Sequence, residues 1–440
     1  MNRSGKFAAA ASVALGLMVP AWSAAASAPP DSSDGAPAGT SSAEDLNAWA
    51  LDYTSGTAGE ASGEPIKLGY VTQEVSFPEA SLGIEAAVEY VNAELGGATG
   101  RPIELVECHV ASAEDASRCG AEMANNDEIV AVLTGALTVG NKDLYDALDG
   151  NKPVLLGPGL TIDDFITPVG VTYTAGTTGV IQGLASFTIT DLAPTSVAVV
   201  FVDNAGGQAA ANVLLKPALD AAGVTSTLVA VAETASAPDV ASALQAAGAD
   251  TADVLISILG VTGCIASYDA LRSLDISPTV VTTGLCSGTP VTTHLADIGV
   301  EGDVPDGWYF GGPGYDYFRP DYESGMETYV AKVHEYGEPV GGASIIEYTG
   351  FAGATFANLL TMTKFLNELG TDALDFASLD ATLRGFTGPM MMQAGPIECG
   401  IGVFVAVCGH QMGITQYLDG DWVSIHDAVI GDPIDVIPAS

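Results

Sequence analysis

Two threonines each precede the first residue of a predicted helix. Groups at a helix N-terminus can donate hydrogen bonds to an acceptor oxygen of a ligand. Thr138 follows the apolar run 129–133 and a glycine-containing turn, and Thr161 follows a second apolar run, 153–157. A helix N-terminus offers unpaired N–H groups and a positive dipole end, and a hydroxyl adds a donor without adding charge. The pattern predicts a site for a ligand carboxylate. Helix capping needs the same residue types, and we interpret Asn141 as a capping residue.

Phosphate binding and catalysis have less support in the sequence. Lys142 lies one residue into the predicted helix, and the turn before it has neither the phosphate-loop nor the dinucleotide-binding spacing. No Gly-x-Ser-x-Gly motif occurs, and the five histidines are scattered without a nucleophile at motif spacing. We therefore expect no catalytic residue, no cofactor and no metal. An exported enzyme is kept as a third hypothesis.

Apolar strands alternate with amphipathic helices, which predicts parallel sheets covered on both faces. Two such runs, 66–171 and 197–284, predict an α/β protein with two doubly wound lobes. The last third differs, with helices over 321–334 and 347–369 and a hairpin at Asp419-Gly420.

Ligands of open parallel sheets bind beyond the carboxyl ends of the strands. This rule adds loops 69–74, 157–164, 202–208 and 259–264 to the loop that holds Thr138. The predicted ligand-binding residues are Thr138, Thr161, Gly159, Leu160, Tyr70, Gln73, Glu74, Asp203, Asn204 and Val261.

The N-terminus predicts secretion. Arg3 and Lys6 precede the apolar run 7–22, and the small residues 23–28 offer cleavage sites, so residues 1–28 are predicted to be a signal peptide. An uncleaved membrane anchor is the alternative. No cysteine precedes Cys108, so a lipid-anchor cysteine is not expected. Residues 29–63 are rich in Ala, Ser, Gly and Pro and predict a flexible linker, with one short helix near 44–51. We expect the mature protein to be soluble outside the cytoplasm.

The chain is strongly acidic, with 54 acidic against 13 basic residues and a formal net charge of −41. Such a surface repels nucleic acid and anionic lipid head groups. An even number of cysteines in an exported chain predicts disulfides. The six cysteines fall into three local groups, which predicts the pairs Cys108–Cys119, Cys264–Cys286 and Cys399–Cys408. Because His109 and His410 adjoin cysteines, a metal site is the competing prediction.

The segments "IKLGYV", "GIEAAVEYVNAELGGATGRPIEL", "TGALT" and "PVLLGPGLT" resemble the type I periplasmic binding proteins of ABC importers, above all the leucine/isoleucine/valine-binding proteins. The resemblance runs from about residue 67 to 425. It implies two lobes joined by three crossing strands, placed here at 172–178, 307–312 and 387–392. The first lobe is then 64–172 plus 312–387, the second is 173–311 plus 388–430, and 431–440 is a tail.

The resemblance further implies that the loop of Thr138 presents hydroxyls to a ligand carboxylate and that Thr161 does the same. Amino-acid binders of the family place an acidic side chain near Gly284 or Leu285 and an aromatic near Gly260, and this sequence has neither. Residues that could compensate are Glu74, Asp203, Tyr70, Tyr309 and Tyr315. These differences argue against a standard branched-chain amino acid, and the predicted solute is a small polar or amphipathic molecule, with an amino-acid-like solute still open.

The predicted function is that of the solute receptor of an ABC importer, with a small-molecule solute, a permease and an ATPase as partners. We expect a monomer that binds no nucleic acid. A ligand sensor that signals through a partner protein is the alternative.

Overall fold

The computed structural model describes residues 42–300, 302, 304–312, 324–337, 351–370, 374–391, 397–400, 404–425 and 434–435. The predicted signal peptide, Tyr315 and most of the tail 431–440 lie outside these ranges. None of the helices within the described ranges is both long enough and apolar enough to cross a membrane.

The first lobe is built on a five-stranded parallel sheet with the strand order β2-β1-β3-β4-β5. In this sheet Val71 is level with both Cys108 and Thr134, so the carboxyl ends of the three neighbouring strands lie side by side. The strands are β1 (Ile66–Thr72), β2 (Ile103–His109), β3 (Ile129–Thr134), β4 (Val154–Leu155) and β5 (Gly170–Val171).

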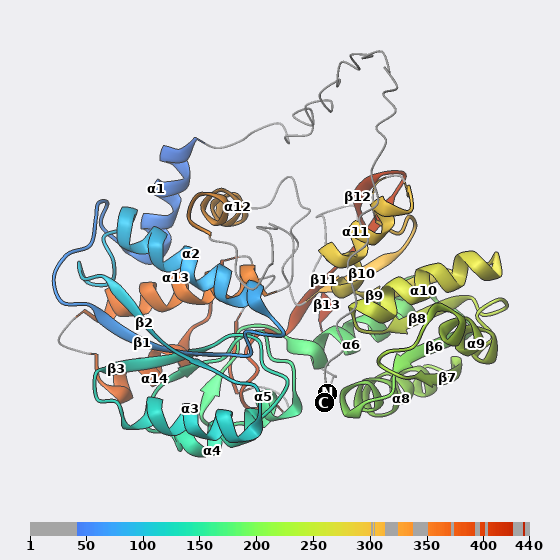
Figure 1. Cartoon of the computed structure of the whole chain (residues 1–440), viewed down its shortest axis with the longest axis horizontal. Coiled ribbons are helices and arrows are strands. Elements are labelled where there is room, and N and C mark those ends of the chain that lie inside the picture. Colours follow the sequence, from blue (N-terminus) through green and yellow to red (C-terminus); the bar gives the residue numbers. More distant parts are fainter. Residues whose placement is uncertain are drawn as a thin grey trace, which may run out of the picture. The chain divides into compact units, whose positions relative to one another are not determined.

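Helices cover both faces of this sheet (Figure 1). One face packs with α2 and α13 in a core that includes Leu68, Tyr90 and Phe356, and the other packs with α3 and α4. A Cβ at Gly83 would lie 2.1 Å from the carbonyl oxygen of Ala352, so only glycine permits the close approach of α2 and α13. The helices are α1 (Ala43–Thr54), α2 (Pro78–Glu94), α3 (Ala113–Asn125), α4 (Asn141–Leu148), α5 (Ile162–Ile166), α12 (Ser324–Tyr336), α13 (Ala352–Leu369) and α14 (Phe376–Gly385).

The second lobe is built on an eight-stranded sheet with the order β12-β11-β10-β9-β8-β6-β7, and β13 also pairs with β11. β6 to β10 are parallel, and β11 and β12 form the predicted hairpin, with positive φ at Asp419 and Gly420. The strands are β6 (Ser196–Val202), β7 (Thr225–Val231), β8 (Val254–Ile258), β9 (Thr279–Thr283), β10 (Tyr309–Gly312), β11 (Gln411–Leu418), β12 (Asp421–Ser424) and β13 (Ile434–Asp435).

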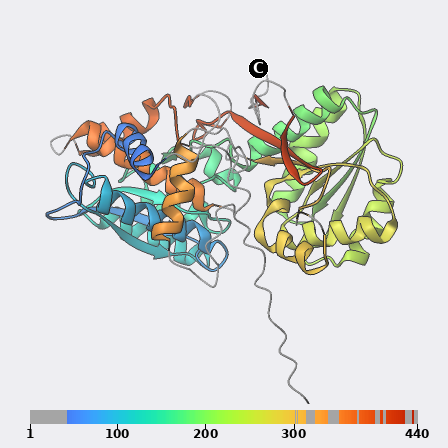
Figure 2. The same ribbon diagram turned by 90° about the horizontal axis from the view of Figure 1, so that it is seen from above.

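Helices of the second lobe form two cores, one on each face of its sheet. The helices are α6 (Gly176–Phe187), α7 (Ala205–Gln208), α8 (Lys216–Ala221), α9 (Ala237–Ala247), α10 (Val261–Leu274) and α11 (Thr289–Asp297), with π-helical turns at Thr188–Leu192 and Ala209–Leu215 and a 3₁₀ turn at Gly284–Ser287. In Figures 1 and 2 the red strand β11 lies with the green and yellow elements of this lobe, although it comes from the C-terminal part of the chain.

The predicted third crossing at 387–392 is wrong. Met390 and Met391 are buried in the first-lobe core, and Cys408 belongs to the same core. The chain instead passes between sheets just before β11, where Cys408 N donates to Thr172 O at 2.9 Å and Thr172 N donates to Ala406 O at 2.8 Å. Met391 N also donates to the Tyr53 hydroxyl of α1 at 3.1 Å, so Met390 and Met391 belong with the first lobe, as do Ile397 and Cys408.

The predicted flexible linker is also wrong for residues 43–63. The expected short helix is present as α1, which buries Leu46 and Ala50 and places the Tyr53 hydroxyl 2.7 Å from Thr361 Oγ1. Gly59 then pairs with Leu95. An apolar stripe on α1 outweighs the polar composition of the segment, because burying it stabilises a fixed position.

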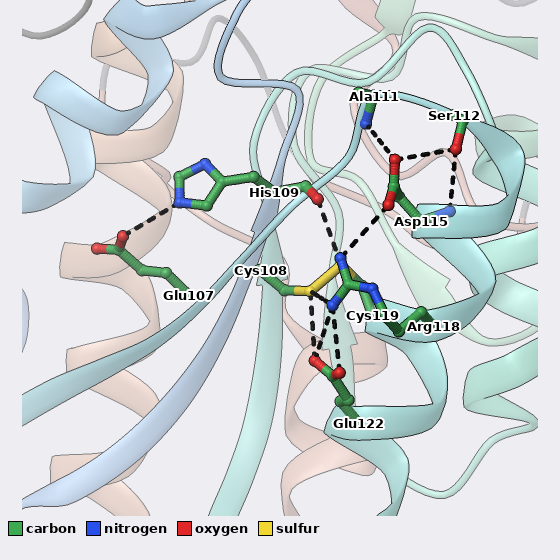
Figure 3. The surroundings of a disulfide bond; sticks show 9 residues. All are labelled: Glu107, Cys108, His109, Ala111, Ser112, Asp115, Arg118, Cys119 and Glu122. Atoms are coloured by element: carbon green, nitrogen blue, oxygen red, sulfur yellow. Dashed lines mark hydrogen bonds and ion pairs between the residues drawn. A yellow bond between two sulfur atoms is a disulfide. The ribbon is translucent and has the colours of Figure 1, made fainter.

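The predicted disulfides are confirmed, with pairs at Cys108–Cys119, Cys264–Cys286 and Cys399–Cys408. The first ties the end of β2 to α3, beside Arg118, which donates to Glu122 (Figure 3). His109 lies 3.6 Å from Glu107, and His410 Nε2 lies 2.7 Å from the carbonyl oxygen of Glu398. All six sulfurs are thus used, and the competing cysteine–histidine metal site has no thiolate to form it.

Candidate functional site

Thr138 and Gln73 are brought together at the carboxyl edge of the first sheet. Thr138 is exposed in the loop after β3, and both its backbone N–H and its hydroxyl donate to Gln73 Oε1, each at 3.0 Å. Gln73 comes from the loop after β1. Two predicted ligand residues from different loops therefore share one contact, which follows from the neighbouring positions of β1 and β3 in the sheet.

Thr161 is the N-cap residue of α5 and forms a capping box with Asp164, in which its buried hydroxyl faces the backbone N–H of Asp164. The backbone N–H groups of Leu160 and Thr161 both donate to the carboxylate of Asp164, each at 2.8 Å. The helix start is therefore closed by Thr161 and Asp164 together.

Asp164 also ties this loop to α4. Its carboxylate accepts from Asn141 Nδ2 at 2.7 Å and from the Tyr145 hydroxyl at 2.5 Å, in a site where Asp164 is 4% exposed. Burial, together with the negative charge of Asp164, raises the pKa of Tyr145 well above its usual value, so Tyr145 stays a neutral donor. Four donors compensate the cost of burying this charge.

The predicted capping role of Asn141 is wrong, because the N-cap position of α4 is Gly140, whose φ of +73° suits glycine. Asn141 instead donates to Asp164 and to Leu137 O. Sequence reasoning did not single out Asp164 or Tyr145. The signal for Asp164 was present, because a Thr followed three residues later by an acidic residue is a capping pattern.

A small cavity lies between the loops after β3 and β4, and first-lobe residues form it. Gly157 is required there, since a Cβ at this position would lie 2.3 Å from the carbonyl oxygen of Gly135. The lining residues are Thr134, Gly135, Leu137, Asn141, Leu156, Gly157, Gly159, Leu160 and Asp164.

Tyr70 and Glu74 do not lie open to a ligand. Tyr70 is 1% exposed in the first-lobe core, and burial raises the pKa of its hydroxyl. The carboxylate of Glu74 accepts a hydrogen bond from Ser81 and lies 4.0 Å from His109 Nδ1. Tyr70 lies two residues before the end of β1, and the pleat of the strand turns its side chain into the core shared with α2.

The predicted second-lobe residues sit in two places at the carboxyl edge of the second sheet, after β6 and after β8. Asp203 is exposed and accepts from Gln208 Nε2 at 2.7 Å, and Asn204 Oδ1 accepts from Gly207 N at 2.8 Å. Val261 begins α10 and packs partly against the second core. Within the described residues, no hydrogen bond or ion pair joins these three to Thr138 or Thr161.

Amino-acid binders of the family that the sequence resembles carry an aromatic side chain near Gly260 and an acidic side chain near Gly284 or Leu285. In this protein these three positions are exposed. A Cβ at Gly260 would meet no atom within 4 Å, and Leu285 is 41% exposed. Tyr309 packs against Phe187, with ring centroids 5.1 Å apart.

The sequence matches the family model described as periplasmic binding protein over residues 65–400. The chain belongs to the periplasmic binding protein family. The resemblance inferred from the sequence is thereby confirmed, and so are the two parallel-sheet lobes. No curated protein matches the sequence of this periplasmic binding protein at a significant level.

Solved structures share the fold of this periplasmic binding protein at low sequence identity. A solute-binding protein of an ABC transporter from R. palustris, in complex with 4-hydroxybenzoate, is 15% identical with a TM-score of 0.62, over 84% of this chain and 96% of that one. A substrate-binding protein from Desulfitobacterium hafniense, complexed with Leu, is 18% identical with a TM-score of 0.61, over 82% and 99%. A fatty acid ABC transporter substrate-binding protein from Thermomonospora curvata is 14% identical with a TM-score of 0.63, over 86% and 95%.

Proposed function

We propose that this periplasmic binding protein is the extracytoplasmic receptor of an ABC importer. It captures a small polar or amphipathic solute between its two lobes and delivers it to a membrane permease and its ATPase, without a chemical step. The family match over residues 65–400 supports the receptor role. Three disulfides support export, because disulfides persist in oxidising compartments.

The observation that carries the site is the group of hydroxyl and N–H donors at the carboxyl edge of the first sheet. Thr138 contributes its backbone N–H and its hydroxyl, both of which Gln73 Oε1 accepts in the structure, and Thr161 contributes a buried hydroxyl at the start of α5. Lys142, which follows the loop of Thr138, bonds Asp146 at 2.5 Å. Neutral donors without a fixed positive charge suit a carboxylate or a neutral oxygen. We therefore propose a solute with one carboxylate, amino-acid-like or a simple organic acid.

A thermal-shift screen of the full mature chain tests this function. L-leucine, 4-hydroxybenzoate and octanoate represent the solute classes named for similar structures, and a solute at 100 times its Kd stabilises a protein by about 2.7 kcal/mol. We expect at least one acid to raise Tm. A screen extended to amides and small aromatics in which nothing shifts Tm would remove the basis of the receptor proposal.

Substitution then locates the site. Thr138→Ala and Thr161→Ala should each weaken binding of the acid found, by about fivefold to tenfold for one lost hydrogen bond. Thr225→Ala is the matched control, because Thr225 is exposed at the amino end of β7. Unchanged affinity in both site variants would place the solute elsewhere.

A further inference from the structure

Gln73 occupies both hydrogen-bond donors of Thr138. Its Oε1 atom lies 3.0 Å from the backbone nitrogen and 3.0 Å from Oγ1 of Thr138. The other end of the carboxamide is also held, because Nε2 donates to Ser76 Oγ at 2.8 Å. The Gln73 backbone N–H donates to Ala136 O at 3.3 Å. These contacts hold the side chain of Gln73 across the two loops.

One oxygen that accepts from a backbone N–H and a neighbouring hydroxyl adopts the arrangement that a carboxylate oxygen of a solute would need. Thr138 is exposed, so a solute can reach it. Each of its two donor groups carries a single hydrogen, so neither can serve Gln73 and a solute at full strength. Gln73 Oε1 and a solute oxygen thus compete for one position.

We propose that Gln73 is a specificity-determining residue that fills the acceptor position of Thr138 in the solute-free protein and yields it to a carboxylate. The inference rests on the proposed function and concerns the same site. Hydrogen bonds to an ionised acceptor are roughly twice as strong as those between neutral groups. A carboxylate therefore gains on displacing the carboxamide, whereas a neutral hydroxyl or amide exchanges one neutral acceptor for another and gains nothing.

Acetate, the smallest stable alkyl carboxylate, tests this without knowledge of the natural solute. Nuclear magnetic resonance of the labelled mature chain would follow the Thr138 amide during titration with acetate and, separately, with acetamide. We expect acetate to shift this amide and acetamide to leave it unmoved. Gln73→Ala empties the position and should lower the Kd for acetate about tenfold. Gln73→Glu places a competing carboxylate there and should raise that Kd at least tenfold.

Two controls separate this from a general effect of substitution. Gln245→Ala removes an exposed glutamine of α9 in the second lobe, outside the candidate loops, and it should leave acetate binding unchanged. Thr138→Val, which lacks the hydroxyl, should reduce the gain caused by Gln73→Ala when the two are combined.

Weaker acetate binding by Gln73→Ala would make Gln73 a contact of the solute and overturn the proposal. An unchanged Kd for acetate in Gln73→Ala would also overturn it. The same holds if acetate shifts the Thr138 amide resonance in neither the wild type nor Gln73→Ala. A solute that shifts Tm in the screen while acetate leaves Thr138 unmoved would overturn this inference alone. Acetate competing with Gln73 while no solute shifts Tm would count against the receptor function instead.

Discussion

Asn141 Nδ2 lies 2.7 Å from the carboxylate of Asp164, and this hydrogen bond joins α4 to the loop after β4. Both residues are almost fully buried, at 3% and 4% exposure. The loop that carries Thr161 is thereby fixed against the helix that follows Thr138. The two candidate solute loops are held by one anionic acceptor beneath them, so their geometry is set before a solute arrives.

Asp164→Asn should destabilise the protein. The substitution keeps one acceptor oxygen but turns the other into a donor that faces two groups which already donate, either Asn141 and Tyr145 or the N–H groups of Leu160 and Thr161. Loss of charged hydrogen bonds in a buried site costs about 2–4 kcal/mol in the free energy of unfolding. Denaturant unfolding measures this. Asp163→Asn, one residue earlier in α5, is the control and should change the free energy of unfolding by under about 0.5 kcal/mol. Equal losses of stability in the two variants would contradict the role assigned to Asp164.

Glu85→Gln should change stability in a pH-dependent way. Burial and the nearby carboxylates of Glu107 and Glu74 raise the pKa of Glu85 to about 7 in the folded protein, from 4.5. Glu85 and Glu107 line a groove of about 730 Å³ beside α2 and β2. Because the folded state holds the proton more tightly, the stability contributed by Glu85 is complete below pH 4.5 and is lost as pH rises to about 7.

Glutamine stands in for the protonated side chain of Glu85. The Tm of Glu85→Gln should therefore match wild type near pH 4.5 and exceed it near pH 8. Thermal unfolding across this pH range is the measurement. Glu89→Gln, on an exposed position of the same helix, is the control and should show a smaller pH-dependent difference. A Tm difference for Glu85→Gln that is constant with pH would refute the prediction.

Removing the Cys264–Cys286 disulfide should lower stability by about 3 kcal/mol, on the chain-entropy model. The bond spans 22 residues and ties the first turn of α10 to the turn after β9. Denaturant unfolding of Cys264→Ala with Cys286→Ala would show the loss. Reductant should then lower the stability of the variant less than that of wild type, since one bond is already gone. A variant as stable as oxidised wild type would be inconsistent with a structural role.

Gly157→Ala should distort the candidate site. The added methyl carbon would lie 2.3 Å from Gly135 O and 2.7 Å from Thr134 O, which are backbone atoms that cannot rotate away. Overpacking of this kind costs about 1–3 kcal/mol, and binding of the solute should weaken with it. Gly385→Ala is the control, because no atom lies within 4 Å of its added carbon. Denaturant unfolding and thermal-shift assays with the solute measure stability and binding in both variants. A Gly157→Ala protein as stable and as tight in binding as Gly385→Ala would contradict the close contact.

Much of the fold could be predicted because its signals are local. The alternation of apolar strands and amphipathic helices, the Asp419-Gly420 hairpin and the three cysteine pairs each depend on residues near one another in the chain. The third crossing was misplaced because the run at Met390 and Met391 is apolar enough for either lobe. Which core it joins depends on contacts with distant elements, such as the hydrogen bond from Met391 N to the Tyr53 hydroxyl of α1, and these cannot be read from the sequence.

The candidate site divides in the same way. The amino-acid order by itself determined that Thr138 and Thr161 follow strands and precede helices, and that Asp164 stands at capping distance from Thr161. Only the tertiary structure decided that Gln73, 65 residues before Thr138, occupies its donors, that Asn141 bonds Asp164 across 23 residues, and that Tyr70 is buried. Those contacts follow from the order and register of β1, β3 and β4 in the sheet, which are set by packing among distant elements.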